Sequence, residues 1–153
     1  MRNAASATGC LVLFSLMVLA SAQQAATPEL KARADAAQGG ERVSLSLDYA
    51  RQQLELANKL YSDGDVEKAE AAIGEVLIYS QRATTAATTA NKKLKQTEID
   101  LRKMEHRMRD IGASLSIDDR PPVEKTVQEL EDLRANLLAK MFGAKAEPKD
   151  NPQ

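Results

Sequence analysis

Small and apolar residues recur over residues 66–115 at steps that alternate between four and three positions. They are Ala69, Ile73, Val76, Ser80, Ala83, Ala87, Ala90, Leu94, Thr97, Leu101, Met104, Met108, Ile111 and Leu115. This spacing places all of them on one face of an α-helix, and no proline interrupts the run. The pattern predicts one continuous helix over about 66–115, with a length of about 75 Å.

A weak region lies in the middle of this predicted helix, where residues 82–91 read RATTAATTAN. Each threonine there costs about 0.5 kcal/mol of helix propensity relative to alanine. The chain either continues through this region or folds back, and folding back would give a four-helix up-down-up-down bundle with a break near 84–91. We favour the continuous helix, because the apolar register passes the region unshifted and neither Gly nor Pro is present to turn the chain.

The same spacing predicts a shorter helix on each side, over about 43–62 and about 122–142. Their apolar positions are Val43, Leu47, Ala50, Leu54, Ala57 and Tyr61 in the first, and Val123, Val127, Leu130, Leu133, Leu137 and Met141 in the second. Ser44 is the expected N-cap of the first helix. Short connections place each helix antiparallel to one half of the long helix, so the predicted fold class is all-α.

The first residues have the features of a signal peptide. Residues 10–20 form an apolar run of about half the ~20 residues that cross a bilayer, and Ala20-Ser21-Ala22 fits a cleavage site. We therefore expect residues 1–22 to be removed after Ala22 and the protein to be exported, to a bacterial periplasm or outside the cell. Residues 23–42 are expected to be a flexible leader or short helix, residues 43–143 the helical domain, and residues 144–153 a disordered tail.

Composition and charge exclude several classes of function. The only cysteine, Cys10, would leave with the signal peptide, which excludes disulfides, thiolate catalysis and cysteine-based metal sites. Loss of Arg2 leaves 20 of the 21 basic residues against 22 acidic ones, a formal net charge of −2. A chain of this charge is a poor nucleic-acid binder, so we expect no nucleic-acid partner.

The segment LANKLYSDGDVEKAEAAI resembles the central hairpin of a tetratricopeptide repeat, a likeness that covers residues 53–81. Leu56-Ala57, Tyr61, Gly64-Asp65 and Ala69 match the repeat's Leu-Gly pair, tyrosine, turn and small residue. Gln53 and Gln81 depart from its tryptophan and proline, and no second copy follows. The resemblance implies an antiparallel helical hairpin.

His106 stands between Met104 and Met108, three residues whose side chains can bind copper or haem. On a helix, however, His106 is turned about 200° away from Met104, so we expect two core methionines and a solvent-facing histidine. Asp118 and Asp119 are expected to cap the last helix. We accordingly predict no catalytic residue, no cofactor and no metal site.

Charged residues are unevenly distributed along the long predicted helix and the segment after it. The first is rich in Lys92, Lys93, Lys95, Arg102, Lys103, Arg107 and Arg109, and the second in Asp118, Asp119, Glu124, Glu129, Glu131 and Asp132. We expect pairing between the two, together with the pairs Glu98–Arg102 and Glu105–Arg109 along the helix. A basic strip that binds anionic lipid or cell-wall polymer is the alternative.

The functional hypothesis is an exported non-enzymatic interaction module, an adaptor, scaffold or chaperone-like binder, that contacts a protein partner or a second copy through coiled-coil-type helix packing. Its expected interaction seam is Ala83, Ala87, Ala90, Leu94, Leu101, Met104, Met108 and Ile111. The small residues near Ala83 are the preferred contact, because neither short helix is expected to cover them. The alternative is a small-ligand or metal carrier built as the four-helix bundle. We expect no membrane span in the mature chain and see no small-molecule substrate.

Overall fold

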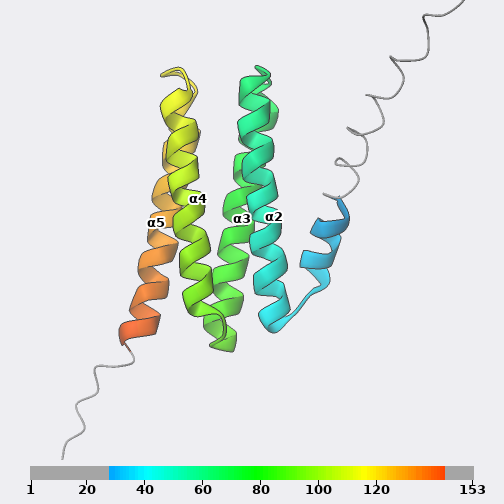
Figure 1. The fold of residues 1–153 in the computed structure, drawn as a ribbon, viewed down its shortest axis with the longest axis vertical. Helices are drawn as coiled ribbons and strands as arrows, with labels where there is room; N and C mark the ends of the chain where they lie inside the picture. Colours follow the sequence, from blue (N-terminus) through cyan, green and yellow to red (C-terminus); the bar gives the residue numbers. More distant parts are fainter. Residues whose placement is uncertain (1–27, 144–153) are drawn as a thin grey trace, which may run out of the picture.

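The structure, a computed structural model, describes residues 28–143, and all regular structure in this range is helical. A short helix over residues 28–36 precedes four long ones, α2 (Gly39–Ser62), α3 (Val66–Ala90), α4 (Leu94–Ser114) and α5 (Arg120–Gly143) (Figure 1). The predicted all-α class is confirmed. The predictions for residues 1–22 and 144–153 lie outside the described residues.

The predicted continuous helix over 66–115 is wrong, because the chain turns at residues 91–93. Asn91 has a φ of 50° and Lys93 a φ of 59°, both in the left-handed region. The amides of Asn91 and Lys92 donate to the carbonyl of Ala87, which closes the end of α3. Asparagine is enriched in this conformation, so the turn needs neither glycine nor proline.

The four long helices form the up-down-up-down bundle that was the alternative prediction (Figure 1). They are arranged as two antiparallel hairpins, α2–α3 and α4–α5, which lie side by side. α3 packs against α5, and α2 meets α4 through an ion pair between Arg107 and Glu55 at 3.1 Å. The turns 63–65 and 115–119 lie at one end of the bundle, and the turn 91–93 lies at the other.

The outer helices differ from their predicted bounds mainly at the start of α2. This helix begins at Gly39 rather than near residue 43, and Gly39 has a φ of +54° that lets the chain turn into the helix. Ser44 therefore lies inside the helix, where its hydroxyl donates to the carbonyl of Gly40 at 3.4 Å, and it does not act as the predicted cap. α5 spans Arg120–Gly143, close to the predicted 122–142.

Candidate interaction surface

The predicted interaction seam faces the interior of the bundle. Ala83, Ala87, Leu101, Met104, Met108 and Ile111 are buried, and Ala90 and Leu94, beside the turn, are half-buried. Because the chain folds back, α3 packs mainly against α2 and α5 and α4 packs mainly against α5, so both halves of the stripe are covered within the bundle. The expectation that the small residues near Ala83 are left uncovered is therefore wrong, since Ala83 and Ala87 are both 0% exposed.

The outer face of the α2–α3 hairpin, away from α4 and α5, carries the short helix 28–36. Lys31 Nζ lies 2.6 Å from Glu75 Oε2 of α3, and the hydroxyl of Tyr49 donates to the same oxygen at 3.1 Å. One turn later, Asp35 accepts a hydrogen bond from the Tyr79 hydroxyl at 2.6 Å and pairs with Arg82. The helix is thus held to the hairpin by two ion pairs and by both tyrosines.

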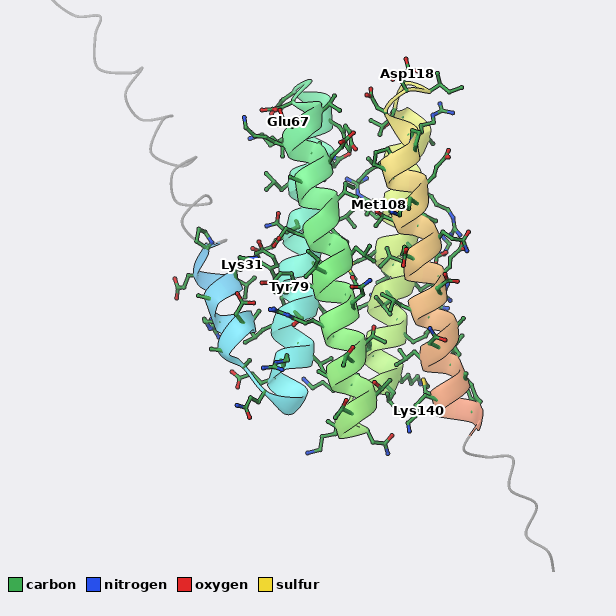
Figure 2. The ribbon with its side chains drawn as sticks, turned by 180° about the vertical axis from the view of Figure 1, so that it is seen from behind. Lys31, Glu67, Tyr79, Met108, Asp118 and Lys140 are labelled. Carbon is green, nitrogen blue, oxygen red and sulfur yellow. The ribbon has the colours of Figure 1, made fainter. Side chains whose placement is uncertain are left out.

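Tyr49 and Tyr79 form an aromatic pair at the centre of this contact, with ring centroids 4.4 Å apart and planes tilted by 59°. The ammonium of Lys31 lies 4.8 Å from the Tyr79 ring centroid (Figure 2). The guanidinium of Arg82 lies 4.9 Å from the same centroid. Both cations are within the range of a cation–π interaction. Tyr49 and Tyr79 are 4% and 1% exposed, so their hydroxyls need the carboxylates that they contact.

The contacts within the cluster favour the charged form of Asp35 and the neutral forms of Tyr49 and Tyr79. The Tyr79 hydrogen bond, followed by that of Arg82, holds the pKa of Asp35 below its usual value. Burial, then the charge of Glu75, raises the pKa of Tyr49 to about 12. Burial and the hydrogen bond to Asp35 also raise the pKa of Tyr79. The contact is therefore fully formed at neutral pH.

An open groove of about 510 Å³ continues along α3 beside the docked helix. Gly39 and Arg42 at the start of α2 form one wall, and the outward stripe of α3 from Ile78 to Ala90 forms the other. Ile78 is the largest apolar side chain that lines the groove, and it is 48% exposed. The outer face of α2–α3 thus has one part covered by helix 28–36 and one part open. We call this face, with its Tyr49–Tyr79 cluster and its groove, the outer α3 surface.

A second charged cluster joins α4 to α5. Arg134 donates to Glu105 at 2.6 Å and to Glu98 at 3.0 Å, while Arg109 pairs with both Glu105 and Glu131. The predicted pairs Glu98–Arg102 and Glu105–Arg109 are confirmed. Each of the two helices supplies both acids and bases to the pairing. Arg109 of α4 pairs with Glu131 of α5, whereas Arg134 of α5 pairs with glutamates of α4.

Met104 and Met108 are 2% and 0% exposed in the core, and His106 points to solvent, as predicted. Asp119 accepts a hydrogen bond from Ser116 at 2.8 Å in the turn before α5. Among residues 28–143, no three His, Cys, Asp or Glu side chains are grouped so that they could hold a metal ion.

Sequence reasoning missed the outer α3 surface, although a signal for it exists. Tyr49 and Tyr79 each lie beside the main apolar stripe of their helix, at positions that an antiparallel hairpin brings to the same level. Two off-stripe tyrosines at one level indicate a second buried face. The helix that packs on these tyrosines was not recognised from the sequence, because the alanines of residues 32–37 give its buried face little apolar area.

Comparison of the chain with protein families, curated proteins and solved structures found no match in any of the three. The tetratricopeptide-like pattern of residues 53–81 therefore stays a resemblance. The antiparallel hairpin that it implies is present as α2–α3. No helix in the described part of the chain combines the length and the apolar composition of a membrane span.

Proposed function

We propose that the protein is a non-enzymatic helical interaction module and that the outer α3 surface binds its protein partner. The observation that supports this most directly is the docking of helix 28–36 on that surface. A helix of this length is unstable in isolation, so the hairpin face must supply most of its stabilisation. The docked helix therefore supports an amphipathic helix as the ligand of this surface.

The docked helix also indicates the chemistry of a preferred ligand. Ala34 is 0% exposed, so a small side chain is required at this position of the ligand helix. A base and an acid four positions apart, as in Lys31 and Asp35, match Glu75 and Arg82 on the hairpin. A partner helix with this pattern would fit the same contacts, and the open groove near Ile78 leaves room for it to extend further along α3.

We place this activity in an exported protein. The apolar run at residues 10–20 and the small residues at 20–22 support export with cleavage after Ala22. N-terminal sequencing of the protein purified from its native cells tests the compartment, since a mature chain that begins at Gln23 is expected. Detection of an intact N-terminus in the cytoplasmic fraction would contradict export.

The binding proposal is tested by moving the docked helix from the chain to a peptide. In a chain that starts at Gln23, Ala34→Glu should expel helix 28–36, because Ala34 has no room for a longer side chain. A labelled peptide of residues 27–38 should then bind this variant at least about tenfold more tightly than it binds the unchanged chain, where the attached helix competes. Fluorescence anisotropy measures the two affinities.

Ala36→Glu is the matched control, because Ala36 is exposed on the same helix and the substitution adds the same charge. This variant should behave as the unchanged chain does. Equal binding of the peptide to both glutamate variants, or binding to neither, would contradict the proposal. A peptide that carries Ala34→Glu should bind none of the proteins.

Light scattering separates the two classes of partner. If the partner is a second copy, the unchanged chain should have twice the mass of the monomer, and Ile78→Glu should reduce the mass to that of the monomer. If the partner is a different protein, the unchanged chain and the Ile78→Glu variant should both be monomers. The matched control is Leu56→Glu, because Leu56 is 40% exposed on α2 and does not line the groove.

A further inference from the structure

The turns at the two ends of the bundle have opposite charge. The turns 63–65 and 115–119 contain four aspartates and no basic residue, whereas the turn 91–93 contains Lys92 and Lys93. Lys95 in the first turn of α4 and Lys140 in the last turn of α5 lie at the same end as these lysines. Figure 2 shows Glu67 and Asp118 at one end and Lys140 at the other. We call Lys92, Lys93, Lys95 and Lys140, together with Phe142, the basic end.

The lysines of the basic end form no ion pair with another described residue, so their charge is available to a ligand. Of the basic residues on α4, Arg102, Arg107 and Arg109 pair with glutamates. The four lysines of the basic end are exposed and have no carboxylate of residues 28–143 within ion-pair distance, and Lys93 donates to the Ser44 hydroxyl instead. The first turn of α2, at the same end of the bundle, contains one exposed carboxylate, Glu41, which does not pair with these lysines.

An exposed aromatic side chain accompanies the lysines. Phe142 is 62% exposed in the last turn of α5, and the contacts of Arg134 with Glu98 and Glu105 place that turn beside the start of α4. Lysines around an exposed phenylalanine are typical of surfaces that bind anionic bilayers, where the cations meet head groups and the ring enters the acyl boundary.

We propose that the basic end docks on an anionic phospholipid bilayer, with the bundle axis standing away from the membrane and the aspartate turns farthest from it. This goes beyond the proposed function, since it concerns an end of the bundle rather than the outer α3 surface. Two helix diameters on a side give the end an area of about 400 Å². That is about half of the ~800 Å² per partner of a stable protein interface, which disfavours a second copy joined end to end.

Vesicle sedimentation tests the proposal with a chain that starts at Gln23, which contains every described residue and lacks the apolar run at 10–20. This chain should bind vesicles of phosphatidylcholine mixed with phosphatidylglycerol and should not bind phosphatidylcholine alone. Added salt should release it. The variant with Lys92→Gln, Lys95→Gln and Lys140→Gln should bind at least about tenfold more weakly, because each lysine near an anionic surface contributes about fivefold.

The matched control removes three exposed lysines near the aspartate turns, Lys59→Gln, Lys68→Gln and Lys125→Gln, and makes the same change in net charge. It should bind as the unchanged chain does. Phe142→Ser should also weaken binding, whereas Leu56→Ser, a loss of exposed apolar area elsewhere on the bundle, should not. Equal loss of binding in both triple variants would overturn the proposal.

Two further outcomes would also overturn it. Soluble polyphosphate that binds the chain more tightly than vesicles do, with no effect of Phe142→Ser, would identify an anionic polymer as the ligand. In light scattering without lipid, a mass above the monomer that falls to the monomer in the basic-end variant would identify a second copy instead.

Discussion

Glu105 lies on α4 with 3% of its surface exposed and accepts hydrogen bonds from Arg134 and Arg109. Burial alone raises the pKa of Glu105, but the hydrogen bonds and charges of the two arginines outweigh burial and lower the pKa below its ordinary 4.5. Arg134 also contacts Glu98, so one α5 side chain joins two carboxylates of α4. These contacts link α4 to α5.

Glu105→Gln should therefore lower the free energy of unfolding by about 2 kcal/mol near neutral pH. A fully buried pair that loses one member costs about 3–5 kcal/mol, and the value is smaller here because Arg134 keeps Glu98 and is partly exposed. The folded state has the lower pKa, so the stabilisation is complete above 4.5 and is lost as the pH falls through the folded value. The unchanged chain and the variant should converge in stability in acid.

Chemical denaturation at neutral and acidic pH measures both effects. Glu131→Gln serves as the control, because Glu131 contacts the same Arg109 and is 36% exposed, and it should cost about 0.5 kcal/mol or less. A Glu105→Gln effect as small as that of Glu131→Gln would show that the cluster does not stabilise the hairpin.

At the scale of elements, the turn between α3 and α4 decides the architecture. Lys93 has a φ of 59°, a conformation that costs a non-glycine residue about 1–2 kcal/mol. The cost is met because folding back buries the apolar stripes of α3 and α4 within one chain, where a continuous helix would leave them to a partner. Short-range propensity is thus overruled by burial between elements that are distant in sequence.

Glycine substitutions at two nearby lysines should have opposite effects. Lys93→Gly relieves the left-handed strain and should leave stability unchanged or raise it by about 0.5 kcal/mol. Lys95→Gly places glycine inside α4 and should lower stability by about 1 kcal/mol. Thermal or urea unfolding of the two variants measures the difference. Equal destabilisation by both would mean that residue 93 is helical and that α3 continues into α4.

The helices and their stripes were predictable, since Ala83, Met104 and Ile111 all occupy the buried face that their spacing indicated. The turn was not, because Asn91 and Lys93 carry no local signal comparable to Gly or Pro, and the apolar register happens to continue across them. The docking of helix 28–36 was not predicted either, since it depends on Tyr49 and Tyr79 meeting across a hairpin. Local periodicity is enough to predict the helices and their buried faces. Contacts between helices can be recognised only once the fold is known.

At the scale of the whole molecule, the bundle brings together residues that a continuous helix would separate. α3 has 25 residues, so the described bundle is about 37 Å long, half the length of the predicted single helix. The turns 63–65 and 115–119 lie together at one end (Figure 1). The distance between these turns therefore distinguishes the two architectures directly.

Spin labels on Asp63→Cys and Asp118→Cys, in a chain that starts at Gln23 and so lacks Cys10, should give a distance of about 10–25 Å by electron–electron double resonance. A continuous helix predicts about 70 Å for the same pair. Labels at Asp63 and Lys92 provide the control, because both architectures place them about 40 Å apart. A long first distance would reject the bundle.

The turn at residues 91–93 also governs how the two hairpins can separate. Four peptide steps join Ala90 to Leu94, so these ends of α3 and α4 stay within about 14 Å of each other. At the opposite end each turn connects helices of the same hairpin, and no peptide links one hairpin to the other. The two hairpins can thus separate by a hinge motion about the turn 91–93, and this motion would part them most at the end that carries the turns 63–65 and 115–119.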